Sequence, residues 1–190
     1  MQHKKINWWK TDFTNGESNQ ITNAISQKKI SQGPLVKLFE ERIGKTINAP
    51  YVVATTSGSV AILMSLMAIG IKPGDEVIIP NRTWISTAHA VFLLGARVRV
   101  VDVKKEVPII DEKLIEEKIN KKTRAIMPVY MGGRYANLKK INSLGRKYNI
   151  PIVEDSAQAF YSKNNKVFVG TEGDIACFSL SVAKLISTGQ

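Results

Sequence analysis

Three short runs of the chain are apolar along nearly their whole length. They are VIIP, AIMPVY and PIVED, within residues 76–80, 125–130 and 151–155. A strand without apolar-polar alternation must be covered on both faces, as happens in parallel sheets flanked by helices. Stretches with helical spacing separate these runs, and this alternation predicts an α/β fold with a mainly parallel sheet.

The same patterns extend along most of the chain. Helical spacing or helix start and stop signals predict helices at 17–30, from 34 onward, 57–69, 83–94, 111–120 and 138–148. Apolar runs predict strands at 51–54, 76–80, 98–103, 125–130, 151–155 and 176–180. Residues 1–15 have no clear period and are expected to form an N-terminal arm before one domain, 16–190. Because the chain stops just after a strand-like run, we expect this domain to be incomplete at its C-terminal side.

Composition narrows the class of protein. With 190 residues and 44% apolar side chains, the chain suits one ordinary globular domain. No apolar run reaches the roughly 18 residues of a membrane helix, so no membrane partner is expected. The N-terminus lacks an apolar signal core, and the single Cys177 cannot form an internal disulfide. A cytoplasmic protein is therefore expected.

The net charge of +11 favours anionic partners, including nucleic acid and phosphorylated small molecules. The charge is spread, however: residues 1–95 hold ten Lys or Arg against six Asp or Glu, and residues 96–190 hold seventeen against ten. No block of five like charges occurs, which favours a generally basic surface over a nucleic-acid footprint. We therefore expect no nucleic-acid partner. The alternative is a basic protein that binds nucleic acid.

Residues that follow the predicted strands are candidates for binding, because ligands of α/β proteins bind at the carboxyl ends of strands. Ser57, Gly58 and Ser59 open a helix, where backbone amides can bind a phosphate, although Ser57 alone could simply cap the helix. The spacing excludes a P-loop. Trp84 follows the strand 76–80 and could stack on a flat ligand or belong to the core.

Two carboxylates, Glu154 and Asp155, end the strand 151–155. Neighbouring side chains of a strand point to opposite faces, so only one of them is expected to face the cleft. A single aspartate there could pair with a cationic ligand nitrogen or with a metal, but no Cys/His cluster supports a metal site. Lys184 lies among small and apolar residues, where desolvation would favour the neutral, nucleophilic form of its amine. The alternative is a surface lysine whose ammonium group extends into solvent.

Together these features describe one kind of site. A phosphate cradle, a flat aromatic ring, a carboxylate for a ring nitrogen and an imine-forming lysine are what pyridoxal 5'-phosphate (PLP) requires.

The sequence also resembles a known family, the DegT/DnrJ/EryC1/StrS sugar aminotransferases. The matching segments, in order, are ISQGPLVKLFEERIG, TTSGSVAI, IKPGDEVIIPNRTWISTAHAVFLLGARVRVVDV, KTRAIMPVYMGG, IPIVEDSAQAF and GDIACFSLSVAKLISTGQ. The resemblance runs from about Ile6 to Gln190 and corresponds to the N-terminal half of a typical member. It implies the three-layer α/β/α large domain of fold type I PLP-dependent transferases, C-terminally truncated and without the family's small C-terminal domain.

The resemblance also implies roles for individual residues. Lys184 resembles the lysine that forms an imine with the cofactor, and Asp155 the aspartate that binds its pyridine nitrogen. Gln158 resembles the residue that contacts the phenolic oxygen, and Trp84 the ring that stacks on the cofactor. Gly58, Ser59 and Ser179 fall where the family holds the phosphate.

The implied activity is transfer of an amino group from an amino acid, usually glutamate, to a nucleotide-linked keto-sugar, for polysaccharide or glycoconjugate precursors. Members act as homodimers with sites built from two subunits, and a separate C-terminal half is a further expected partner. Relatives that act as dehydratases carry histidine in place of the lysine, so Lys184 argues against that branch. A non-catalytic remnant or a regulatory PLP-binding fragment is the alternative, because the fragment alone is expected to be inactive.

Overall fold

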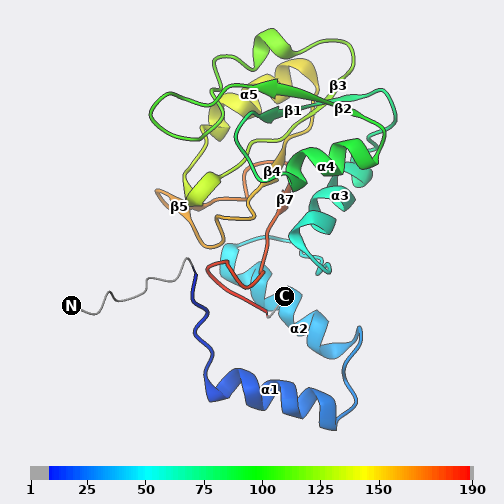
Figure 1. The fold of residues 1–190 in the computed structure, drawn as a ribbon, viewed down its shortest axis with the longest axis vertical. Helices are drawn as coiled ribbons and strands as arrows, with labels where there is room; N and C mark the ends of the chain where they lie inside the picture. The colour runs from blue at the N-terminus through cyan, green and yellow to red at the C-terminus, as the bar shows by residue number, and fades with distance from the viewer. Residues whose placement is uncertain (1–8, 189–190) are drawn as a thin grey trace, which may run out of the picture. The chain divides into compact units, whose positions relative to one another are not determined.

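The computed structural model of the chain describes residues 9–188 (Figure 1). The first eight residues of the predicted arm, and Gly189 and Gln190, lie outside the described residues. The chain forms two compact units, Met1–Ala54 with Leu180–Gln190, and Thr55–Ser179. The domain boundary predicted near residue 15 stays a prediction.

The second unit contains a parallel sheet. Strand β1 (Glu76–Pro80) pairs in parallel with β2 (Arg97–Val101) and with β3 (Thr123–Ile126), in the order β2-β1-β3. Strand β4 (Val153–Asp155) pairs in parallel with β7 (Ile175–Cys177). Isolated parallel bridges, Ile126 to Ile152 and Val129 to Asp155, join the two groups. The predicted mainly parallel sheet is thus confirmed.

Helices cover both faces of this sheet. Helices α3 (Gly58–Ala68) and α4 (Ser86–Leu93) lie on one face, and α5 (Leu138–Tyr148) lies on the other (Figure 1). Alternate strand residues belong to two separate cores: Val77, Ile79, Met127 and Val153 pack with α3 and α4, whereas Ile78, Ile126 and Ile152 pack with α5. The predicted three-layer α/β/α arrangement is therefore confirmed.

The first unit consists of two helices and irregular segments. Helix α1 (Asn15–Ser26) begins with a capping box in which the Glu17 carboxylate accepts a hydrogen bond from the Thr14 amide at 2.8 Å. Helix α2 (Pro34–Ile47) begins at a proline, as the sequence predicted. No helix within residues 9–188 has both the length and the apolarity that crossing a membrane requires.

The strand predicted at 51–54 is wrong. Residues 51–54 form no strand, and the side chains of Tyr51 and Val53 are 91% and 72% exposed. The Ala54 amide donates to the Glu40 carboxylate at 2.8 Å instead of to a neighbouring strand. An apolar run predicts a strand only where a partner strand is available, and none pairs with this segment.

The helix predicted at 111–120 is also wrong. Its regular structure is limited to the 3₁₀ turn η1 (Glu116–Lys118). The Ile115 side chain is buried in the core beneath α5, and the Asp111 carboxylate accepts a hydrogen bond from the Lys113 amide at 3.0 Å without a regular helix following it. Tertiary packing therefore overrides the local helical signal of Asp111.

Two short elements and several boundaries differ from the prediction. An antiparallel hairpin, which was not predicted from the sequence, consists of strands β5 (Lys163–Asn164) and β6 (Val167–Phe168). The turn η2 (Met131–Gly133) was likewise not predicted. Helix α4 begins three residues later than predicted, whereas the bounds predicted for β1 and α5 are confirmed.

A buried carboxylate holds one side of the sheet together. Glu154 is 1% exposed, and it accepts hydrogen bonds from the Tyr130 hydroxyl and from the amides of Gly170, Glu172 and Gly173. A buried charge is costly unless hydrogen bonds compensate it, and these four donors do so. Burial, together with the Glu154 carboxylate, raises the pKa of Tyr130 well above its ordinary value near 10.

We expect Tyr130→Phe to lower the free energy of unfolding by about 1–3 kcal/mol at pH 7, because it removes one donor from a buried carboxylate. The raised pKa adds a pH dependence: the stability that Tyr130 contributes is complete below pH 10 and is lost as the pH rises further, because only the unfolded chain then ionises. Urea denaturation should therefore show that the difference in the free energy of unfolding between wild type and variant is smaller above pH 10 than at pH 7.

The matched control is Tyr51→Phe, because Tyr51 is 91% exposed. It should leave the urea midpoint unchanged at both pH values. A Tyr130→Phe variant as stable as this control at pH 7 would show that the phenol contributes nothing to the Glu154 network.

Candidate functional site

The strand ends of the second unit bring most of the predicted site residues to one edge of the sheet. Trp84 follows β1, Asp155 ends β4 and Ser179 follows β7. Because all these strands are parallel, their carboxyl ends share one edge. The start of α3, with Gly58 and Ser59, is packed against the same edge.

The start of α3 is shaped to receive an anion. Ser57 caps the helix, which is one of the two interpretations that the sequence allowed. The Ser57 hydroxyl accepts from the Val60 amide at 3.2 Å, and the Ser57 carbonyl accepts from the Ala61 amide at 2.9 Å. The amides of Gly58 and Ser59 are the remaining donors of this first turn. Together with the positive end of the helix dipole, these amides are suited to binding an anion such as a phosphate.

Gly58 lets the segment after β7 approach α3 closely. A Cβ atom at Gly58 would lie 2.8 Å from the Ser179 Cβ, 3.2 Å from the Ser179 Oγ and 3.3 Å from the Phe178 carbonyl oxygen. Any larger residue would push the two segments apart. The structure therefore brings the predicted phosphate residues Gly58, Ser59 and Ser179 together.

A further hydroxyl joins this cluster. The Oγ atoms of Ser59 and Ser86 lie 2.7 Å apart, so the first turns of α3 and α4 meet through their side chains. We call Gly58, Ser59, Ser86 and Ser179 the hydroxyl cradle. Ser86 was not predicted as a site residue, because the sequence pattern placed residues 83–94 in one helix. The hydroxyl residues of TWIST, at residues 83–87 shortly after β1, could have indicated it.

Asp155 lies at the buried end of β4, with 4% of its surface exposed. Its Oδ2 accepts from the Thr87 hydroxyl at 2.7 Å, and its Oδ1 accepts from the Ala157 amide at 3.2 Å. Asp155 therefore faces α4, whereas Glu154 faces the opposite side of the sheet. This confirms that adjacent carboxylates of one strand do not form an acid/base pair.

Trp84 and Gln158 have the exposure and the bonding that a ligand contact needs. The Trp84 side chain is 66% exposed, so the alternative that it belongs to the core is wrong. The Gln158 Oε1 accepts from the Gly132 amide at 2.9 Å, which orients the side chain and leaves its NH₂ group as a donor. An exposed indole and an oriented amide donor suit an aromatic ligand with an anionic oxygen.

Lys184 belongs to the other unit. Its amide donates to the Ser181 carbonyl at 2.9 Å, and the nearby Val182 carbonyl accepts from the Thr11 hydroxyl at 2.8 Å. These bonds define the local turn that carries Lys184. The role of Lys184 toward the site in the second unit stays a prediction.

The chain's one thiol is unsuited to catalysis. Cys177 is 1% exposed, and its Sγ lies 3.0 Å from the Ser65 Oγ. Burial raises the pKa of Cys177 to about 12, which keeps the thiol neutral and unreactive. It is a small core residue, as predicted. No group of three or more potential metal ligands occurs among residues 9–188.

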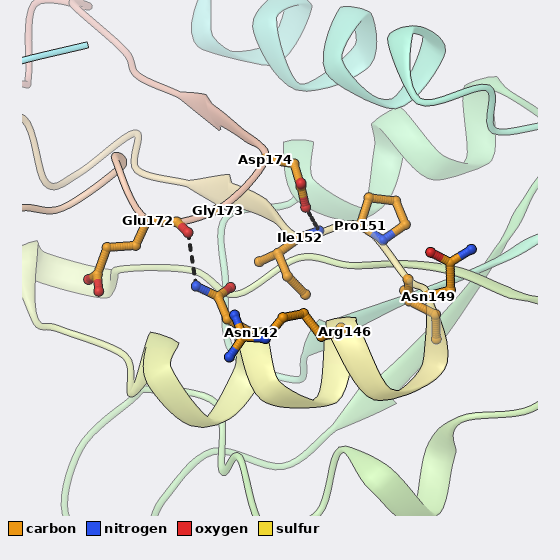
Figure 2. A pocket seen from close by; sticks show the side chains of 10 residues that line it. Asn142, Arg146, Asn149, Pro151, Ile152, Glu172, Gly173 and Asp174 are labelled. Atoms are coloured by element: carbon orange, nitrogen blue, oxygen red, sulfur yellow. Dashed lines mark hydrogen bonds between the residues drawn. The ribbon is translucent and has the colours of Figure 1, made fainter. Parts of the chain in front are cut away.

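A cavity of about 450 Å³ lies at the opposite edge of the sheet, where β4 and β7 begin (Figure 2). The Asn142 side chain donates to the Glu172 carbonyl at 2.9 Å, and the Asp174 carboxylate accepts from the Ile152 amide at 2.8 Å (Figure 2). These bonds tie α5 and the start of β4 to residues 172–174. None of the predicted site residues lines this cavity.

The residues at the carboxyl edge fit PLP. The hydroxyl cradle suits its phosphate, and the Asp155 carboxylate suits a protonated ring nitrogen. The close approach of Ser179 leaves no room for a side chain at residue 58, and it brings the Ser179 hydroxyl beside the start of α3. The fit rests on residues of one unit alone.

Comparisons with known proteins agree with this fit. The chain is 34% identical to GDP-perosamine synthase of Escherichia coli O157:H7 over 98% of its own length and 52% of the relative's. Among solved structures, it resembles a sugar aminotransferase of Streptococcus pneumoniae in its PLP form, with 26% identity and a TM-score of 0.92 over 97% of this chain and 51% of that one.

Another similar structure is a GDP-4-keto-6-deoxy-D-mannose-3-dehydratase of E. coli with bound hydrated PLP, with 28% identity and a TM-score of 0.90 over 96% of this chain and 49% of that one. The chain thus spans about half the length of the relatives it matches. Residues 12–190 match the sequence model of the DegT/DnrJ/EryC1/StrS aminotransferase family. The chain belongs to the DegT/DnrJ/EryC1/StrS aminotransferase family.

Proposed function

We propose that this chain is the cofactor-binding part of a PLP-dependent aminotransferase that transfers an amino group from an amino acid, glutamate in particular, to a nucleotide-linked keto-sugar. The observation that carries the proposal is the meeting of the hydroxyl cradle and Asp155 at one edge of the parallel sheet. The product would serve polysaccharide or glycoconjugate synthesis, in a cytoplasmic homodimer.

The chain's own residues divide the binding of PLP among them. The amides of Gly58 and Ser59, with the hydroxyls of Ser86 and Ser179, would hold the phosphate. Asp155 would bind the ring nitrogen and keep it protonated. Gln158 would donate to the phenolic oxygen, and the Trp84 indole would cover the ring and exclude water from it.

PLP, when bound, supplies an electron sink for the carbon that gives up or receives the amino group. Lys184 would bind the cofactor covalently at rest. Once an incoming amine has displaced it, the Lys184 amine would take a proton from the donor carbon and later return one to the sugar carbon. The same amine thus serves as base and acid in the two half-reactions.

The substrate class rests on the relatives. The names of the E. coli synthase and dehydratase both point to GDP-linked sugars, which supports a nucleotide-linked keto-sugar here. The net charge of +11 suits a diphosphate-bearing substrate. Lys184 favours amino transfer over the dehydratase branch, in which the resemblance implies a histidine at this position.

We expect PLP to give the protein a visible absorption band that borohydride removes. Peptide mass spectrometry should then find a pyridoxyl group on Lys184, because only a covalently bound lysine is trapped by reduction. Lys184→Ala should lose both signals, and the exposed Lys166→Ala should keep both. Absence of a band in the wild type would overturn the proposal and favour the basic binding protein.

Gly58→Ala tests the hydroxyl cradle. The added methyl would lie 2.8 Å from the Ser179 Cβ, so the segment after β7 must move away from α3. We expect the Kd for PLP to rise by about tenfold or more, equivalent to about 1.4 kcal/mol. The Kd for pyridoxal, which lacks the phosphate, should change little.

Isothermal titration or fluorescence quenching measures both constants. Gly33→Ala is the control, because a Cβ at Gly33 meets no atom within 4 Å. Equal losses of PLP and pyridoxal affinity in Gly58→Ala would place the phosphate elsewhere.

Amino transfer separates an enzyme from a non-catalytic remnant. The PLP-loaded protein, expressed with any sequence that follows Gln190 in its gene, should convert one equivalent of glutamate per site to 2-oxoglutarate. Chromatography of the products measures this single turnover. A protein that binds PLP on Lys184 but converts neither glutamate nor any other amino acid to its 2-oxo acid would be a remnant or a regulatory fragment.

A further inference from the structure

Three side chains of the second unit form a continuous hydrogen-bonded row that ends on Asp155. The Oγ1 atoms of Thr83 and Thr87 lie 2.7 Å apart, and the Thr87 Oγ1 lies 2.7 Å from the Asp155 Oδ2. Thr87 is 0% exposed and Asp155 is 4% exposed, whereas Thr83 is half-buried. The row therefore runs from a half-buried hydroxyl into the interior.

The chemistry of the three groups fixes the direction of the hydrogen bonds. A hydroxyl carries one proton, and an ionised carboxylate can only accept. Thr87 must therefore donate its proton to Asp155, which leaves its lone pairs to accept from Thr83. Thr83 therefore donates to Thr87, and Thr87 donates to Asp155. Each hydrogen bond polarises the hydroxyl that accepts it and so strengthens the next bond.

The location of Thr87 argues that its hydroxyl serves this purpose. It lies on α4, whose neighbouring residues Ala90 and Val91 are buried in the apolar core between α4 and the sheet. A valine has the same shape and would satisfy that core without a polar group. Burying a hydroxyl there is costly unless it is hydrogen-bonded, and the bonds it makes connect it to Asp155.

We propose that Thr87 is a positioning residue that holds Asp155 as an oriented carboxylate toward the ring nitrogen of PLP, with Thr83 as its support. The proposal rests on the proposed function, because it takes Asp155 as the partner of that nitrogen. Thr87 fixes Oδ2 and the Ala157 amide fixes Oδ1, so together they set the carboxylate plane. A donor to the charged form also favours that form, which keeps the proton on the ring nitrogen.

The test compares Thr87→Val with Thr87→Ser, each loaded with PLP that carries ¹⁵N in the ring. We expect the ¹⁵N resonance of Thr87→Val to move toward the unprotonated position, because Asp155 then competes for the proton. The Kd for PLP should rise about tenfold, the loss expected for a bond to a charged group. Thr87→Ser keeps the hydroxyl and should restore the wild-type resonance.

Controls separate positioning from mere stability. Thr46→Val removes an exposed threonine hydroxyl of α2 that bonds the Arg42 carbonyl and should change neither readout. If Thr87→Val lowers the melting temperature but leaves the ¹⁵N resonance unchanged, Thr87 is only structural and the inference is overturned. If Thr87→Val does not fold, Thr83→Val decides: a smaller shift in the same direction supports the row, and no shift overturns it.

The test also distinguishes this inference from the proposed function. A wild-type protein that binds no PLP overturns both together. A wild-type protein that binds PLP with a protonated ring nitrogen, and a Thr87→Val variant with the same nitrogen resonance, overturn the role of Thr87 alone.

Discussion

The organisation of the second unit depends on one constraint: strands β1 and β4 of its parallel sheet are buried on both faces. Val77 and Ile79 pack against α3 and α4, and the intervening Ile78 packs against the α5 side. Each crossover returns the chain to the opposite edge before the next parallel strand begins, so all the parallel strands end at one edge of the sheet. That edge is where polar groups can gather without entering either core, and it is where Trp84, Asp155 and Ser179 lie.

The same constraint explains how two neighbouring carboxylates take different roles. At the end of β4, strand alternation sends Glu154 toward one face and Asp155 toward the other. Four donors compensate Glu154, and it anchors the turn at 170–173. Asp155 is bonded by a hydroxyl of α4 and faces the side on which the hydroxyl cradle lies. Burial is common to both residues, but they face opposite sides of the sheet and accept hydrogen bonds from different donors.

Much of this could be predicted from the sequence, because burial on both faces leaves a clear apolar signature. The bounds of β1 were predicted correctly for this reason, and those of α5 because Leu138, Ile141 and Leu144 recur at helical spacing. The predictions for residues 51–54 and 111–120 were wrong because tertiary contacts decide the secondary structure there. The first segment is an apolar run without a partner strand, and the second packs into the core beneath α5 without forming an α-helix. Ser86 and Thr87 were missed because one helical pattern hid them, and only the fold reveals that they face Ser59 and Asp155.

The basic composition of the chain and the candidate phosphate site are separate matters. The described residues that form the cradle, Gly58, Ser59, Ser86 and Ser179, carry no charge, although the chain has a net charge of +11. An anion held by amides, hydroxyls and a helix dipole depends on close approach of backbone segments, which a glycine permits. Salt should therefore weaken the binding of a phosphate there only slightly, because short-range hydrogen bonds are screened far less than exposed charges. The lysines and arginines that make the chain basic contribute no side chain to the cradle.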